Sequence, residues 1–280
     1  MKRIATVQDI SCLGKCSLTV ALPVISAMGV EASVIPTAVL STHTMFSRFT
    51  FRDLTEDIPA ILDHWEEEEF SFDAIYTGYL GSKEQLALVG DMFRRFRRSD
   101  NLMIVDPVMG DHGRLYTGFT EEYALSMAEL CGKADIILPN MTEASLMLGL
   151  EYKEEYDRGY VQMVLKKLTG LGARIAVLTG VSFDPGEIGV MGYNSRSGEF
   201  FEHYGEKIDA GYHGTGDIFA SCVVGGLMRG LPLERACALA ADFNRECIRV
   251  TKANPEGIAY GVKFEQVLPW LVKRMEEETA

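Results

Sequence analysis

Short apolar segments alternate with longer amphipathic segments from the N-terminus to Leu178. The short segments are rich in β-branched residues and have the length of buried strands. The six strands that this pattern predicts are Ile4–Val7, Ala32–Ile35, Ala74–Tyr76, Leu102–Val105, Ile136–Leu138 and Ile175–Leu178.

The segments between these strands have the period of a helix. Leu86, Val89, Phe93 and Phe96 step by three, four and three positions and so share one face, while the arginines between positions 94 and 98 lie mostly on the other side. Because a parallel neighbour needs a crossover, repeated alternation of strand and helix is typical of a parallel sheet. We therefore expect a single α/β domain over residues 1–280, with a doubly wound, mostly parallel central sheet and helices on both faces.

The pattern changes after the sixth predicted strand. The runs Ile188–Tyr193 and Glu199–Tyr204 are separated by the polar, glycine-containing segment 194–198, which predicts a β-hairpin. Helical periodicity then returns in Asp217–Arg229, from Leu233 to Val250, and in Phe264–Met275.

The composition narrows the class of partner. Lys and Arg number 27 against 40 Asp and Glu, so the formal net charge is −13, which disfavours nucleic acid and anionic membranes. The longest apolar run, Val20–Val30, is too short to cross a bilayer, and the N-terminus lacks a signal-peptide pattern. Six cysteines without a C-x-x-C motif are typical of reduced thiols. We therefore expect a cytoplasmic protein with neither nucleic acid nor membrane as partner.

Two common nucleotide-binding motifs do not fit the chain. Gly14-Lys15 resembles the end of a Walker A loop, but Asp9 stands where that motif needs Gly, and Cys16 where it needs Ser or Thr. No G-x-G-x-x-G follows a predicted strand, so dinucleotide binding loses its main support.

A glycine-rich segment precedes the helix predicted from Asp217. In Gly211-Tyr212-His213-Gly214-Thr215-Gly216-Asp217 the glycines allow close approach of a ligand, and the first free amides of a helix form an anion site. Asp217 could accept a proton from an attacking hydroxyl while these amides stabilise a transferring phosphoryl group. The alternative is that Thr215 caps the helix and Asp217 only complements its dipole; the motif alone leaves both open.

Two further polar clusters follow predicted strands. Asp106-Pro107-Val108-Met109-Gly110-Asp111 comes after the fourth strand, and Pro139-Asn140-Met141-Thr142-Glu143 after the fifth. Ligands of doubly wound sheets bind beyond the carboxyl ends of the strands, and Mg²⁺ takes one or two carboxylates together with water and phosphate oxygens. Each cluster alone could also be a turn or a helix cap. Together with the glycine-rich segment they predict a site for a nucleotide phosphate, Mg²⁺ and an alcohol.

These motifs, with Val177-Leu178-Thr179-Gly180, resemble the ribokinase superfamily, and within it the pyridoxal (vitamin B6) kinases. Ser41-Thr42-His43-Thr44 is similar to the S-N-H-T of that group, and Gly78-Tyr79-Leu80-Gly81-Ser82 matches its G-Y-L-G-S. The similarity runs from the first predicted strand to about Tyr260, which is nearly the whole chain. The resemblance implies a ribokinase-like fold, ATP-dependent phosphorylation of the 5′-hydroxymethyl group of pyridoxal, pyridoxamine or pyridoxine, and a homodimer.

The resemblance also implies roles for individual residues. Asp217 would be the base, and the amides of Gly214, Thr215 and Gly216 would form the anion hole. The other implied contacts are Mg²⁺ at Asp106, Asp111 and Glu143, the nucleotide at Asn140, Thr179 and Lys252, and the pyridine ring at His43, Thr44 and Tyr79. A monovalent cation stays open as a further cofactor.

The substrate stays open between two kinases. Pyridoxal kinases usually carry Ser after the Gln of the first strand, whereas this chain has Gln8-Asp9, nearer to the Asp of hydroxymethylpyrimidine kinases. Asp9 would face the substrate, where its carboxylate would favour a cationic partner such as pyridoxamine; it could instead pair with Lys15 or cap the next turn. A hydroxymethylpyrimidine kinase, more distantly a sugar or nucleoside kinase, and a ligand-binding regulator without turnover remain the alternatives.

Overall fold

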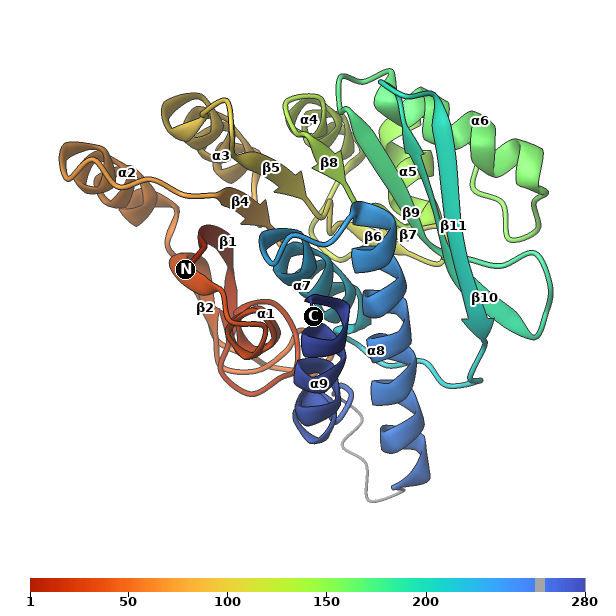
Figure 1. The fold of residues 1–280 in the computed structure, drawn as a ribbon. Coiled ribbons are helices and arrows are strands. Elements are labelled where there is room, and N and C mark those ends of the chain that lie inside the picture. Colours follow the sequence, from red (N-terminus) through yellow and green to blue (C-terminus); the bar gives the residue numbers. More distant parts are fainter. Residues whose placement is uncertain (255–259, 280) are drawn as a thin grey trace.

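A computed structural model describes residues 1–254 and 260–279, and nine of the strands in this part form one twisted sheet (Figure 1). The order across the sheet is β11-β10-β9-β8-β5-β4-β1-β2-β3, and a separate two-stranded ribbon pairs β6 with β7. The strands are β1 (Arg3–Ser11), β2 (Glu31–Leu40), β3 (Phe51–Asp53), β4 (Ala74–Thr77), β5 (Leu102–Val105), β6 (Gly110–Asp111), β7 (Arg114–Leu115), β8 (Ile136–Ile137), β9 (Ile175–Val181), β10 (Glu187–Asn194) and β11 (Glu199–Glu206).

The six central strands from β2 to β9 are parallel, and β3, β10 and β11 are antiparallel at the two edges. This confirms the expected mostly parallel sheet and the hairpin after the sixth predicted strand, which is β10 and β11. The short strands β3, β6 and β7 were not predicted, because two or three residues carry no recognisable period.

Helices connect the strands. They are α1 (Leu18–Ala27), α2 (Ile58–Glu67), α3 (Lys83–Phe96), α4 (Glu121–Cys131), α5 (Met141–Leu148), α6 (Arg158–Thr169), α7 (Thr215–Met228), α8 (Leu233–Ala253) and α9 (Leu268–Thr279), with single 3₁₀ turns at Thr55–Asp57 and Phe264–Gln266. The last helix begins later than predicted, because the chain first makes the 3₁₀ turn at Phe264 and places Pro269 in the first turn of α9, where its missing N–H costs nothing.

The sheet separates two apolar cores. Helices α2 to α6 pack on one face against alternate strand residues such as Val7 and Ile75. Helices α1, α7, α8 and α9 cover the other face, which contains Ile4 and Tyr76 (Figure 1). The strands are thus buried on both sides, as parallel strands usually are. No helix in the described ranges combines the length and apolar character that a membrane span would need.

The chain reverses its direction of travel across the sheet at β1. It moves from β1 to β2 through α1, and then returns to place β4 on the other side of β1. Such a reversal leaves a crevice beyond the carboxyl ends of the strands, where ligands bind in doubly wound sheets. The segments after β1, β4, β5 and β8 all reach this edge, which we call the carboxyl edge.

Candidate active site

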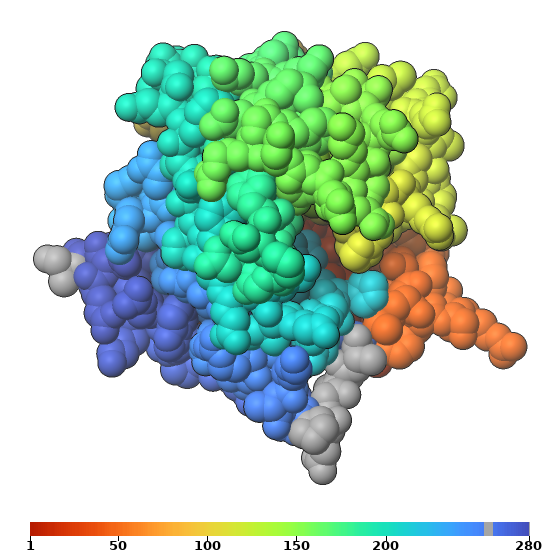
Figure 2. All heavy atoms as spheres, turned by 90° about the vertical axis from the view of Figure 1, so that its right-hand side faces the viewer, coloured from red at the N-terminus to blue at the C-terminus, as the bar shows by residue number. Residues whose placement is uncertain are grey.

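The carboxyl edge is hollowed. In Figure 2 atoms of the N-terminal segment, in dark red, lie deep between an orange segment near residue 50, a yellow segment near residue 110 and a cyan segment that precedes α7. The hollow therefore collects the ends of β1 and β2, the ribbon β6–β7 and the start of α7, which are the segments in which the sequence predicts substrate and phosphate contacts.

The first turn of α7 is open. Gly214 is its N-cap with φ 80°, and none of the described side chains caps the helix. The Thr215 hydroxyl lies 3.4 Å from the Tyr212 carbonyl oxygen, so the alternative in which Thr215 caps α7 is wrong. Ile218 N donates to Gly214 O at 3.0 Å, so the amides of residues 215–217 precede this first bond and stay available to an anion.

Glycine is the one residue type that fits at position 214. A β-carbon there would lie 1.8 Å from the Lys15 carbonyl oxygen, and φ 80° is a conformation that L side chains rarely adopt. At Gly216, by contrast, an added β-carbon meets no atom within 4 Å. Gly214 thus lets α7 pack on the loop after β1, whereas packing does not require glycine at position 216.

The pKa of Asp217 is shifted toward neutral pH. Burial raises the pKa of its carboxyl to about 7, a hydrogen bond from the Ser17 backbone opposes the shift, and the Asp9 charge adds to it. A base with a pKa near the working pH is best placed to take a proton in a reaction. The carboxyl group projects from the third position of α7, beside the open amides.

Asp9 is buried near the carboxyl end of β1. Ser11 Oγ donates to Asp9 Oδ2 at 3.1 Å. Burial raises the pKa of Asp9, while hydrogen bonds from Ser17 and Ser11 act in the opposite direction. Lys15 does not pair with Asp9; its Nζ lies 2.6 Å from Glu265 Oε2, so that alternative is wrong.

Ser17 is a site residue that the sequence did not indicate. It lies next to both carboxyl groups: its side chain opposes the rise in the pKa of Asp9, and its backbone opposes the rise in the pKa of Asp217. It is buried and has φ 49° and ψ −133°, a conformation rare outside glycine. The only sequence signal was its place in the loop after the first strand.

Two of the three predicted metal ligands are buried next to each other. Asp106 directly follows β5, and burial together with the Glu143 charge raises its pKa well above the usual range. Burial raises the pKa of Glu143 to about 8, against the hydrogen bonds that its carboxylate accepts from Asn140 N at 2.9 Å and Met109 N at 3.2 Å. The third ligand, Asp111, is half exposed and accepts a hydrogen bond from His112 N at 2.8 Å.

These carboxylates fit a magnesium ion held partly by a substrate. No group of three or more Asp, Glu, His or Cys side chains in the described part of the chain forms a ready metal cage. No donor among the described residues is hydrogen-bonded to the Asp106 carboxylate, which leaves a buried acceptor pair for a cation or its waters. Mg²⁺ usually keeps several waters and takes one or two carboxylates plus phosphate oxygens.

The three predicted nucleotide contacts differ in their hydrogen-bond partners and exposure. Asn140 Oδ1 accepts from Glu143 N at 2.9 Å, and its amide donates to Gly110 O at the same distance, so both ends of the side chain are already used. Thr179 N donates to Pro139 O at 3.0 Å, which keeps Thr179 beside the start of α5. Lys252 is exposed near the end of α8, and its Nζ lies 3.2 Å from the Asp209 carbonyl oxygen, on the segment that leads to α7.

The predicted pyridine contacts follow the ends of β2 and β4. The His43 ring lies 4.7 Å from that of His213, a residue of the glycine-rich segment to which the sequence assigned no role. Burial and the neighbouring His213 lower the pKa of His43 to about 4, so the ring is neutral at pH 7. Tyr79 packs against Phe119 with 5.5 Å between ring centroids, and Thr44 is exposed.

Comparison with solved structures supports the fold. A phosphomethylpyrimidine kinase homologue from Bacteroides thetaiotaomicron, solved with pyridoxal, is 39% identical, covers 96% of this chain and 95% of its own, and has a TM-score of 0.91. Pyridoxal kinase from Lactobacillus plantarum is 31% identical over 100% of both chains, with a TM-score of 0.90. The ribokinase-like fold and the resemblance to pyridoxal kinases are thereby confirmed.

Comparison by sequence gives both kinase activities among the relatives. A pyridoxine/pyridoxal/pyridoxamine kinase from Bordetella avium is 28% identical and covers 89% of this chain and 85% of its own length. A hydroxymethylpyrimidine/phosphomethylpyrimidine kinase from Aquifex aeolicus is 26% identical, with coverages of 79% and 83%. The sequence profile of one family matches residues 20–262, and this small-molecule kinase therefore belongs to the phosphomethylpyrimidine kinase family.

Proposed function

We propose that this enzyme transfers the γ-phosphoryl group of ATP to the 5′-hydroxymethyl group of pyridoxal, pyridoxamine or pyridoxine. The observation that carries the proposal is the open first turn of α7, with Asp217 on it at a pKa of about 7. A proton acceptor and an anion site then lie side by side, which phosphoryl transfer to an alcohol requires. The pyridoxal-bound homologue supports a vitamer as the alcohol.

Each site residue has a separate role in the proposed reaction. Asp217 takes the hydroxyl proton as the alcohol oxygen forms its bond to phosphorus, and the bond from phosphorus to the bridging oxygen breaks to leave ADP. The amides of Gly214, Thr215 and Gly216 stabilise the charge on the phosphoryl oxygens. His43, Thr44 and Tyr79 hold the pyridine ring, and Asp9 faces its 4-substituent.

The nucleotide and metal contacts are part of the same proposal. Asn140, Thr179 and Lys252 would face the nucleotide, and Asp106, Asp111 and Glu143 would hold Mg²⁺ or its waters. Bound Mg²⁺ would neutralise the phosphate charge during transfer. Asn140, whose side chain is committed to the α5 cap and to Gly110, would act through its position and not through a free amide.

Three further properties stay predictions. They are the homodimer that the resemblance implies, the cytoplasmic location that the free thiols of all six cysteines favour, and the use of a monovalent cation. A regulator without turnover is disfavoured by Asp217, because binding alone does not require a base beside the anion site.

The second candidate is a hydroxymethylpyrimidine kinase. It is favoured by Asp9, which is buried near the carboxyl end of β1 where a hydroxymethylpyrimidine kinase carries Asp, and by the Aquifex aeolicus relative. Both activities use the same base and anion site, so only the substrate distinguishes them.

A coupled assay of ATP consumption tests the proposal. We expect turnover with pyridoxal, pyridoxamine and pyridoxine, with the phosphorylated product followed by its absorbance, and a higher kcat/KM for the best vitamer than for hydroxymethylpyrimidine. The enzyme without an alcohol substrate is the control for background hydrolysis. A preference for hydroxymethylpyrimidine would overturn the vitamer assignment and leave the kinase assignment standing; no turnover with either substrate would overturn both.

A further inference from the structure

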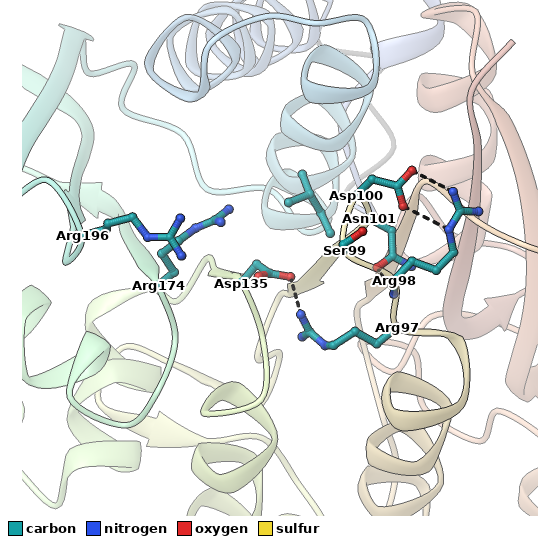
Figure 3. A pocket seen from close by; sticks show the side chains of 9 residues that line it. Arg97, Arg98, Ser99, Asp100, Asn101, Asp135, Arg174 and Arg196 are labelled. Atoms are coloured by element: carbon teal, nitrogen blue, oxygen red, sulfur yellow. Dashed lines mark hydrogen bonds and ion pairs between the residues drawn. The ribbon is translucent and has the colours of Figure 1, made fainter.

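A second cavity lies at the opposite edge of the sheet. It has a volume of about 610 Å³ and opens where β5, β8 and β9 begin (Figure 3). Its charged lining consists of Arg97, Arg98, Arg174, Arg196, Asp100 and Asp135. We call it the arginine cavity.

The arginine cavity and the candidate active site lie at opposite ends of the same three strands, β5, β8 and β9. Leu102 begins β5 and Asp106 follows it, and Asp135 and Asn140 lie before and after β8. Arg174 precedes β9, whereas Thr179 lies in its carboxyl-terminal half. A ligand in this cavity therefore could not touch the groups at the carboxyl edge.

The charge in the cavity is unbalanced. Arg97 pairs with Asp135 at 3.2 Å, and Arg98 holds Asp100 through Nε at 3.0 Å and Nη2 at 2.8 Å. Arg174 and Arg196 have no ion pair with any residue that the structure describes. Four arginines against two aspartates leave a charge of +2 on the wall of a protein whose formal net charge is −13.

The two unpaired arginines start from adjacent backbone positions. Ser195, directly before Arg196, donates to the Arg174 carbonyl oxygen through its amide at 3.0 Å and its hydroxyl at 2.9 Å. Both side chains extend to the same cavity (Figure 3). Like charges that line one cavity repel each other, and an anion between them would be attracted to both.

We propose that the arginine cavity binds a small molecule through a dianionic phosphate group held by Arg174 and Arg196. The planar guanidinium fork matches phosphate oxygens two at a time, and the volume lies in the range of small-ligand sites. Arg97 and Arg98, already neutralised by Asp135 and Asp100, form the polar rim. This site is additional to the proposed phosphoryl-transfer site and does not depend on it.

Calorimetric titration with inorganic phosphate and with glycerol 2-phosphate, at constant ionic strength, tests the proposal. Each lost guanidinium contact should weaken binding about tenfold, so Arg174→Gln/Arg196→Gln should remove the cavity's share of binding. The control Arg94→Gln/Arg249→Gln changes the net charge equally at two exposed arginines outside the cavity. Phosphate held by α7 contributes equally to all variants, so the difference between them reports on the arginine cavity. Comparison of the two probes shows whether free phosphate or a phosphate ester fits better.

A variant that binds phosphate more tightly provides a second test, because misfolding would not tighten binding. Asp100→Asn frees the Arg98 guanidinium and should tighten phosphate binding severalfold, because Asp100 is exposed and holds only Arg98. Arg174→Lys/Arg196→Lys keeps the charge but loses the forks, and should bind more weakly than the wild-type protein. Equal binding by the wild-type protein and Arg174→Gln/Arg196→Gln, or no binding of either probe beyond that of chloride, would overturn the proposal.

Discussion

Helices α5 and α7 both begin at the carboxyl edge and both carry an acidic residue at their third position, yet their first turns differ. In α5 the Asn140 side chain accepts from Glu143 N and the Glu143 side chain accepts from Asn140 N, each at 2.9 Å. In α7 the cap is Gly214, which has no side chain to accept a bond. The start of α5 is therefore closed, and that of α7 is open.

The difference separates a structural helix start from one that can bind a ligand. A capping box satisfies two donors and stabilises the protein without a ligand. An open start forgoes that stabilisation and keeps its amides and dipole for an anion. The predictions below test this division between α5 and α7, in order of decreasing effect.

Replacing the acid of α7 should have the largest effect. Asp217→Asn should lower kcat by about 10²- to 10⁴-fold, because the base acts in the transition state, and should leave nucleotide affinity nearly unchanged. Steady-state kinetics and a nucleotide titration of the purified variant measure both quantities. Turnover within a few-fold of the wild-type rate would remove Asp217 from the mechanism.

Replacing the cap of α7 should come next. Gly214→Ala forces a β-carbon against the Lys15 carbonyl and should displace the anion site, with a loss of about 10²-fold in kcat, as for an oxyanion-hole donor. Gly216→Ala is the matched control, since its β-carbon has open space, and it should cost far less. The kcat of both variants is measured at a temperature at which thermal unfolding shows both to be folded. Similar losses of kcat would mean that the Gly214 geometry is unimportant.

The pH profile tests the setting of Asp217. With a pKa of about 7 the base is protonated below that pH, so kcat/KM should fall about tenfold per pH unit on the acid side and level off above it. Because the Asp9 charge raises the pKa of Asp217, Asp9→Asn should move the acid limb to lower pH. An acid limb near pH 4, the ordinary range of an aspartate, would contradict the buried setting.

The two predicted metal ligands should have similar effects on the Mg²⁺ requirement, but only the ligand on α5 should affect stability. Asp106→Ala and Glu143→Ala should both raise the Mg²⁺ concentration needed for activity, and excess EDTA should abolish it. Only Glu143→Ala should also lower the free energy of unfolding, by about 1 kcal/mol, because it opens the α5 cap. Magnesium titrations and urea unfolding measure the two effects; an unchanged Mg²⁺ requirement in both variants would remove them from the metal site.

The smallest expected effect concerns Asp9. A buried carboxylate favours the ammonium group of pyridoxamine, so Asp9→Ser should lower the pyridoxamine-to-pyridoxal ratio of kcat/KM severalfold. Ser11→Ala, which removes only a hydrogen-bond donor to Asp9, is the milder comparison. An unchanged ratio in Asp9→Ser would show that Asp9 does not contact the 4-substituent.

Much of the fold was predictable because its signals are local. The six central strands, the hairpin and most helices follow from periodicity, and the motifs around Asp106, Asn140 and Asp217 were found where the strands end. Ser17 and His213 received no role because their neighbours are distant in sequence: Asp9 and Asp217 lie near Ser17, and His43 lies near His213.

The sequence by itself determined the α/β alternation, the placement of polar clusters after the strands and the family resemblance. Only the tertiary structure decided which helix start is open, that Lys15 pairs with Glu265 and not with Asp9, and that Arg174 and Arg196 share a cavity. Propensity and pattern act over a few residues and are written along the chain. The pKa of Asp217 and the charge balance of the arginine cavity depend on burial and on charges brought together from distant segments, so they exist only once the sheet has formed.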